Sequence, residues 1–243
     1  MSTTFETGHA KNVANFKSLI NCLETFGVTY NPAKETLKIP HLNTIFSKAQ
    51  TDLLNVVDKN TNYNSAVINR SRAFENLQSL STRLVNALKA TDAPPQRVDD
   101  AKGFQRKLQG KRATAIPKPI DENQPAPVTI SSSQRSYDQQ VQHFTGLIAV
   151  LKSEVSYKPN ENELKIDTLT GMQNDLFEQN NEVSMAHAII TGARIQRNQT
   201  FYANNNGLVD IAQEIKNYVK SAYGANSPQY KQLNALRFRK EKC

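Results

Sequence analysis

The feature that most constrains the fold is a stretch of sequence that occurs twice. Residues 16–42 read FKSLINCLETFGVTYNPAKETLKIPHL, and residues 144–169 read FTGLIAVLKSEVSYKPNENELKIDTL. The match starts with an offset of 128 residues, which becomes 127 after a one-residue deletion, so that Phe16 matches Phe144 and Tyr30 matches Tyr157. Because the apolar positions agree in one register, the chain is predicted to contain two tandem repeats of one structural unit.

Apolar residues in both copies recur at steps of three and four, which is the period of an amphipathic helix. Sustained alternation typical of a strand is absent from the sequence. We therefore predict an all-α fold in which each repeat is an up-down four-helix bundle with short turns. Four prolines and three serines in residues 113–133 indicate a linker. The predicted domains are residues 1–112 and 134–243, joined by this Pro/Ser-rich linker.

The segment after the first helix is predicted to have a structural role. Residues 28–40 contain two prolines and cannot form a continuous helix. The Tyr-x-Pro and Leu-Lys-Ile elements of this segment recur in the second repeat. We expect an extended connection that Tyr30, Leu37 and Ile39 hold against the bundle.

Asparagine-rich segments lie within two of the predicted helical stretches. A second helix is predicted from Pro40 and a third over residues 67–88, and the Asn-rich residues 60–64 either break the helix or only weaken it. In the second repeat, a long third helix is predicted to run to Val219. Residues 204–207 read Asn-Asn-Asn-Gly, which favours a kink or short break there.

The composition argues against secreted and membrane-spanning classes. The sequence has neither the apolar core of a signal peptide nor the ~18 apolar residues of a membrane span, so a cytoplasmic protein is expected. Its two cysteines, Cys22 and Cys243, do not suffice for a disulfide framework. Cys22 matches Val150, which predicts a small apolar packing position with an inert thiol.

The net charge of +8 is concentrated in residues 1–112, which hold 16 Lys/Arg and 9 Asp/Glu. Each predicted repeat ends in a basic cluster, and the two clusters match in position. Such cations can bind the phosphates of nucleic acid or anionic lipid, but cations near a helix C-terminus also complement the helix dipole. The candidate phosphate-binding residues are Arg70, Arg72, Lys107, Lys111, Arg112, Arg237, Arg239 and Lys240.

Catalytic signatures are absent from the sequence. It contains no G-x-S-x-G, H-E-x-x-H or C-x-x-C motif, and residues 109–112 (Gln-Gly-Lys-Arg) lack the remaining features of a phosphate-binding loop. His9, His41, His143 and His187 are not retained in both repeats, and surface or rim positions are expected for them. No catalytic residue, metal ligand or cofactor is predicted, and the protein is expected not to be an enzyme.

Several short motifs give the chain a resemblance to a group of uncharacterised bacterial proteins of the kind found in Bacteroidota. They are V-T-Y-N-P at 28–32, L-K-A-T at 88–91, K-L-Q-G-K-R-A at 107–113, I-S-S-S-Q at 130–134, G-L-V-D-I-A at 207–212 and S-P-Q-Y-K-Q at 227–232. The resemblance covers nearly the whole chain and implies a bacterial, all-helical protein with two repeats. Because no activity is established for that group, the resemblance implies no catalytic or binding residues.

The expected function is that of a non-enzymatic structural or protein-interaction protein. Its long polar helix faces are expected to meet a protein partner or further copies of the chain. The alternative is a basic nucleic-acid-associated protein that binds phosphates non-specifically through the Lys/Arg clusters. The salt dependence of binding distinguishes these two functions. The affinity for phosphates falls steeply as the salt concentration rises, whereas the affinity of a packed helix interface changes little.

Overall fold

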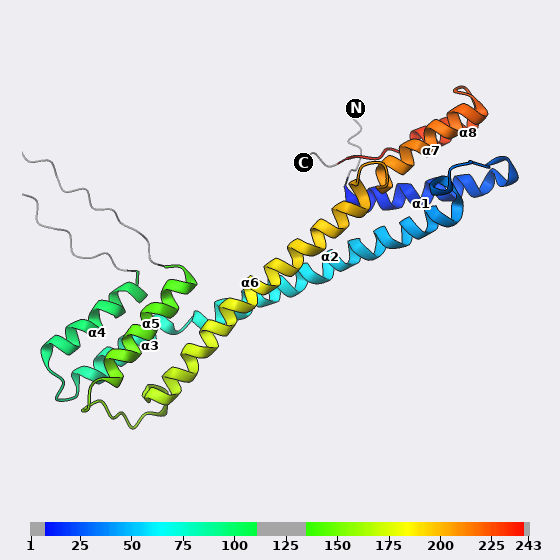
Figure 1. The fold of residues 1–243 in the computed structure, drawn as a ribbon. Helices are drawn as coiled ribbons and strands as arrows, with labels where there is room; N and C mark the ends of the chain where they lie inside the picture. Colours follow the sequence, from blue (N-terminus) through cyan, green and yellow to red (C-terminus); the bar gives the residue numbers. More distant parts are fainter. Residues whose placement is uncertain (1–7, 111–134, 241–243) are drawn as a thin grey trace, which may run out of the picture. The chain divides into compact units, whose positions relative to one another are not determined.

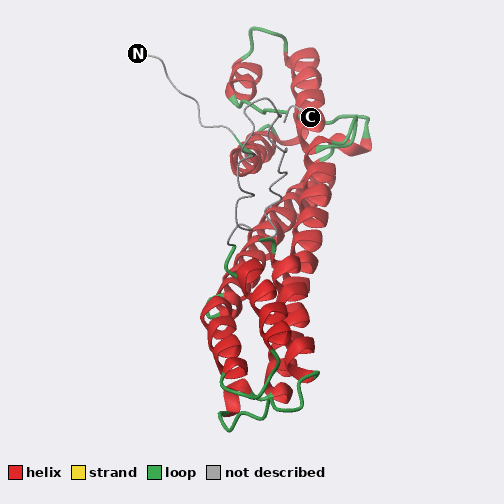
Figure 2. Ribbon diagram, turned by 90° about the vertical axis from the view of Figure 1, so that its left-hand side faces the viewer, coloured by secondary structure: helices red, strands yellow, loops and turns green. Residues whose placement is uncertain are grey.

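The computed structural model describes residues 8–110 and 135–240. The secondary structure of these residues is helical, as predicted, and none of them forms a strand (Figures 1 and 2). Short 3-10 turns lie in the connections at Gly27–Thr29, Glu35–Leu37 and Asn162–Leu164. The α-helices are α1 (His9–Thr25), α2 (Ile39–Phe74), α3 (Leu77–Lys89), α4 (Pro95–Leu108), α5 (Tyr137–Lys152), α6 (Ile166–Tyr202), α7 (Leu208–Tyr223) and α8 (Pro228–Ala235).

The helices form two compact units that differ from the predicted domains, residues 1–112 and 134–243. Unit 1 combines Met1–Tyr63 with Ala186–Cys243, and unit 2 consists of Asn64–Met185. The physical reason is that α2 and α6 are single helices of 36 and 37 residues, and each contributes to both units. A helix with this number of residues is roughly 50 Å long, and the shorter helices packed on it cannot cover its whole length. The predicted linker, residues 113–133, lies outside the described residues.

Each unit combines the first helix of one half of the chain with the last two helices of the other half. In unit 1, α1 packs against α7 and α8. In unit 2, α5, which matches α1 at an offset of 128, packs against α3 and α4. Figure 1 shows both groups, with the blue α1 beside α7 and α8 and the green α3, α4 and α5 together. The predicted bundles, built from consecutive helices of one half, are therefore not observed.

The predicted apolar faces supply most of the two cores. Phe16 and Phe201 are fully buried in unit 1, and Phe144 is fully buried in unit 2. Some apolar residues of the two long helices instead face solvent. The exposed fractions of Val57, Phe177 and Ile189 are 60%, 57% and 52%. In each case a neighbouring residue of the same helix is more buried.

The connection after the first helix packs on the core through Tyr30 and Leu37 as predicted, but it contains two 3-10 turns instead of being extended, and Ile39 already starts α2. The Tyr30 hydroxyl donates a hydrogen bond of 2.6 Å to the Leu37 carbonyl oxygen, and both residues are buried. The matched Tyr157 donates in the same way to the carbonyl oxygen of Leu164 at 2.9 Å. In unit 1, the Tyr30 ring also meets the Tyr218 ring of α7 edge-on, 5.5 Å between centroids. The tyrosine thus closes its own connection and holds it on the core.

Two helix boundaries show how asparagine acts in this chain. Helix α2 is continuous through residues 60–64, so the Asn-rich run there does not break it. The predicted third helix over residues 67–88 is wrong, because α2 ends at Phe74 and α3 starts at Leu77 after Asn76, whose φ and ψ of −92° and 0° are not helical. The predicted break at residues 204–207 is confirmed. Asn205 has a φ of 65°, a left-handed conformation that asparagine tolerates better than most residues.

The environment of Cys22 agrees with a packing role. Its side chain is half-buried against the unit 1 core, and burial raises the pKa of the thiol. The matched Val150 packs in the same way against the unit 2 core. A raised pKa keeps the thiol protonated and weakly nucleophilic. Cys243 lies outside the described residues.

Candidate functional site

The predicted phosphate-binding residues that the structure describes belong to both units. Arg70, Arg72 and Lys107 belong to unit 2. Arg237, Arg239 and Lys240 belong to unit 1. Lys111 and Arg112 lie outside the described residues. Each group is therefore described within its own unit.

Arg70 is engaged inside unit 2. Its guanidinium lies 4.0 Å from the centroid of the Tyr137 ring, and its Nη1 donates a 3.0 Å hydrogen bond to Asn180 Oδ1. Asn180 in turn donates to Asp138 Oδ1 at 2.6 Å. These contacts join α2, α5 and α6, which gives Arg70 a structural role. Arg72, by contrast, is exposed in the last turn of α2.

Lys107 borders a shallow depression of about 350 Å³ in unit 2. The lining also includes Asp99, Asp100, Phe104 and Val150. The Lys107 Nζ lies 5.8 Å from the centroid of the Phe104 ring. Because two carboxylates share the depression with one lysine, it is poorly suited to a phosphate.

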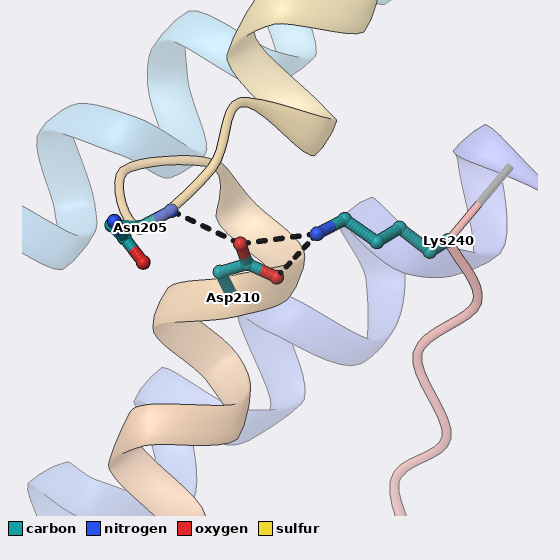
Figure 3. A network of polar contacts seen from close by, with 3 residues as sticks. All are labelled: Asn205, Asp210 and Lys240. Atoms are coloured by element: carbon teal, nitrogen blue, oxygen red, sulfur yellow. Dashed lines mark hydrogen bonds and ion pairs between the residues drawn. The ribbon is translucent and has the colours of Figure 1, made fainter. Parts of the chain in front are cut away.

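A second depression, of about 420 Å³, lies in unit 1 between α7 and the chain that follows α8. Its charged lining residues are Asp210, Lys216, Arg237 and Lys240. Figure 3 shows Asp210 between Lys240 and the backbone N–H of Asn205. The Lys240 Nζ lies 3.0 Å from Asp210 Oδ1, and the Asn205 N–H donates to Oδ2 at 3.1 Å. The hydrogen bond from Lys240, the largest contribution, lowers the pKa of Asp210.

The non-helical residues 236–240 lie against α1 and α7, and we call them the C-terminal segment. Asn12 of α1 makes two hydrogen bonds to one residue of the segment: its Nδ2 donates to the Arg239 carbonyl oxygen at 2.9 Å, and its Oδ1 accepts from the Arg239 N–H at 3.1 Å. Asn15, one helical turn later, donates to the Arg237 carbonyl oxygen at 2.7 Å. The segment is thus held by its main chain.

Lys216 of α7 completes this arrangement from the other side. Only 7% of the residue is exposed, and its Nζ donates to the Leu236 carbonyl oxygen. The same Nζ lies 5.3 Å from the centroid of the Phe238 ring, which also meets the Phe16 ring edge-on at 6.4 Å. Burial lowers the pKa of Lys216. A carbonyl oxygen and an aromatic face therefore solvate this buried ammonium group.

The sequence prediction identified the cations of the C-terminal segment but missed the residues that hold it. A signal was available in the helix patterns. Asn12 directly precedes Val13 on the buried face of α1, and Lys216 lies between Ala212 and Val219 in the apolar stripe of α7. A polar residue at such a position needs a hydrogen-bond partner, and here the partners are main-chain groups.

The histidines differ from the expectation at one position. His41 and His187 are exposed, and His9 is half-buried beside Phe201. His143 is buried on α5, with 5% of the residue exposed, so the predicted surface or rim position is wrong there. Within residues 8–110 and 135–240, the acidic, histidine and cysteine side chains form no group of three or more that is suited to a metal ion.

Comparison with known proteins adds no relative: no protein-family model, curated protein or solved structure matches the chain. Of the helices in the described part of the chain, none has the length and apolar character needed to cross a membrane.

Proposed function

We propose that the chain is a non-enzymatic interaction protein, built from two tandem helical repeats, that binds a protein partner or further copies of itself. One observation carries this proposal: apolar residues recur at matched positions that are exposed. Val28 and Val155 match at an offset of 127, and their exposed fractions are 96% and 81%. Ile68 and Ile195 match at the same offset, with exposed fractions of 50% and 56%.

Packing inside the chain does not account for these four side chains. An apolar residue is retained at a buried position because it fills the core, but a valine that is almost fully exposed contributes little to folding. Covering apolar surface is favourable by roughly 25 cal/mol per Å², so such residues become useful when a partner covers them. Unit 1 carries Val28 and Ile195, and unit 2 carries Val155 and Ile68. Each unit therefore offers one exposed turn valine and one exposed helix isoleucine.

Further exposed apolar residues lie on the two long helices. On the unit 1 portions of α2 and α6, Leu54 and Ile189 have exposed fractions of 62% and 52%. On the unit 2 portion of α6, the exposed fractions of Phe177 and Met185 are 57% and 65%. This supports protein binding along these helices, because protein interfaces favour aromatic residues and methionine over charged side chains.

The nucleic-acid alternative has less support from the described contacts. Arg70 is held by Tyr137 and Asn180, and Lys240 is paired with Asp210. A phosphate would have to replace these internal partners. Within unit 2, the depression beside Lys107 also contains Asp99 and Asp100, which disfavour a phosphate there.

The test compares the full chain with a Val28→Asp/Val155→Asp variant and an Asn64→Asp/Asn181→Asp control. Both variants add two charges at exposed positions, but only the first removes the apolar side chains. Sedimentation velocity over a concentration series and affinity capture are the measurements. We expect the association constant of the valine variant to fall at least tenfold and that of the control to stay unchanged. The free energies of unfolding of both variants should lie within about 0.5 kcal/mol of the wild-type value.

Equal association by wild-type protein and valine variant would contradict the proposal. Binding to labelled mixed-sequence DNA and RNA over a salt series tests the alternative. Binding that collapses as salt rises, and that is lost when Lys111, Arg112, Arg239 and Lys240 are changed to Gln, would favour nucleic-acid association instead.

A further inference from the structure

The groove that holds the C-terminal segment has the properties of a peptide-binding site. It is formed by Asn12 and Asn15 of α1 and by Asp210 and Lys216 of α7, all in unit 1. Three carbonyl oxygens of the segment, those of Leu236, Arg237 and Arg239, accept hydrogen bonds from these side chains. We call this site the α1/α7 groove.

The hydrogen bonds recognise an extended main chain rather than particular side chains. The carbonyl groups of Arg237 and Arg239 both point at α1. Their spacing of two residues is the period of an extended strand. The Asn12 amide bonds both the N–H and the C=O of Arg239, as a neighbouring strand would. Peptide-recognition sites commonly obtain affinity from such main-chain hydrogen bonds and specificity from pockets for individual side chains.

The side chains of Phe238 and Lys240 contribute to that specificity. The Phe238 ring meets the fully buried Phe16 ring edge-on and lies near the ammonium group of Lys216. Two residues further on, Lys240 donates to both carboxylate oxygens of Asp210, and Oδ2 also accepts a hydrogen bond from the Asn205 N–H. The groove therefore selects an aromatic residue followed two positions later by a lysine, a Phe-x-Lys pattern.

We propose that the α1/α7 groove binds an extended Phe-x-Lys segment of a partner protein, and that the chain's own C-terminal segment occupies the groove as an intramolecular competitor. The hydrogen-bonding groups of Asn12 and Lys216 require an occupant when they are buried, and main-chain carbonyl groups of any extended peptide satisfy them. The specificity for lysine follows from the charge of Asp210. The α1/α7 groove is distinct from the exposed valines and isoleucines. A result that contradicts peptide binding in the groove therefore leaves the proposed interaction through those residues untouched, and the reverse also holds.

The experiment uses the acetylated peptide Leu-Arg-Phe-Arg-Lys-amide, fluorescently labelled, and the full-length protein. In a Phe238→Ala/Lys240→Ala variant the internal competitor is weakened while every groove residue is unchanged. We expect the peptide to bind this variant at least tenfold more tightly than it binds the wild-type protein. A second variant, Lys240→Glu, places like charges at this partly exposed ion pair, leaves the Phe238 contacts intact, and serves if the double variant folds poorly.

Substitutions in the groove and in the peptide test the contacts. Asn12→Ala, introduced into the competitor-weakened variant, is expected to lower peptide affinity at least tenfold, whereas the control Asn64→Ala, at an exposed position of unit 2, leaves it unchanged. A peptide with Ala in place of Phe should bind at least tenfold more weakly. Thermal unfolding of each variant shows that the fold is retained.

Three results would overturn the proposal. The first is equal peptide affinity for wild-type and competitor-weakened proteins. The second is equal binding of the Phe and Ala peptides, because the aromatic contact would then have no part in recognition. The third is a dimer that forms through the C-terminal segment and is not dissociated by the peptide, which would assign the groove to a second copy of the chain.

Discussion

At the residue scale, two tyrosines determine the path of the chain between helices. Tyr30 and Tyr157 each place a hydroxyl group on a carbonyl oxygen seven residues later, in a buried environment. Burial raises the pKa of both phenols, that of Tyr157 to about 12, so both remain protonated donors at physiological pH. The hydrogen bond replaces the regular helical bonding that the prolines of this connection prevent.

Tyr30→Phe is expected to lower the free energy of unfolding by about 1–3 kcal/mol, because the buried Leu37 carbonyl group loses its partner while the ring is retained. Urea unfolding followed by circular dichroism measures this. Tyr157→Phe should act similarly in unit 2. Tyr230→Phe is the control, since the described hydrogen bond of Tyr230 is made by its backbone N–H. A Tyr30→Phe protein as stable as this control would contradict the role of the hydroxyl.

His143 is expected to make stability depend on pH. It is buried, its Nε2 has no hydrogen-bond partner in the described part of the chain, and burial, followed by the nearby Lys107 charge, lowers its pKa. The fold therefore favours the neutral ring. The contribution of His143 to the free energy of unfolding is fully present above the pKa of histidine in the unfolded chain, about 6.5. It is lost as the pH falls from there toward the lower pKa of His143 in the folded protein.

The measurement is the difference in unfolding free energy between pH 7.5 and pH 5.0. His143→Asn introduces the residue found at the matched position, Asn15, and removes the titrating ring. We expect this variant to lose less stability than the wild-type protein over that range. Equal losses in the two proteins would show that protonation of His143 does not oppose folding.

At the element scale, the close approach of α4 and α5 depends on a missing side chain. A Cβ atom on Gly146 of α5 would overlap the ring of Phe104 on α4. The matched residue in α1 is Ser18, which is exposed. Gly146 therefore allows the close contact between α5 and Phe104 in unit 2, and Ser18 of α1 makes no corresponding contact.

Gly146→Ala is expected to destabilise the protein by about 1–2 kcal/mol, because overpacking against Phe104 exceeds the gain of ~1 kcal/mol in helix propensity. Gly171→Ala in α6 is the matched control. A Cβ atom there meets nothing within 4 Å, so this change should stabilise the protein by about 0.5–1 kcal/mol. Opposite shifts of the urea midpoint support this account, and a stabilised Gly146→Ala protein would contradict it.

At the scale of the whole molecule, the two halves of the chain depend on each other. The core of unit 1 needs α1 from the first half and α7 and α8 from the second, while unit 2 needs α5 from the second half and α3 and α4 from the first. Neither half contains a complete core. The two units are therefore completed together when the halves associate.

Fragments 1–112 and 134–243, produced separately, are expected to lack the cooperative unfolding transition of the full chain. An equimolar mixture is expected to recover it, because association restores the α1 contacts with α7 and α8 and the α5 contacts with α3 and α4. Circular dichroism and size-exclusion chromatography measure folding and association. A single fragment that unfolds cooperatively as a monomer, at the midpoint of the full chain, would contradict this dependence.

The sequence alone determined the helical class, most of the buried faces and the role of the Tyr30 connection, because these follow from local periodicity and from residues close together in the chain. It missed the turn at Asn76, where a single asparagine and no proline or glycine marks the boundary.

Only the tertiary structure decided which helices pack together and what holds the C-terminal segment. An apolar stripe specifies that a helix face is buried but not which helix covers it, so consecutive and exchanged arrangements bury the same residues. Asn12 and Lys216 bind main-chain carbonyl groups 227 and 20 residues away in the chain. A main-chain carbonyl group is present at every residue, and its partner therefore leaves no pattern in the sequence that could identify the contact.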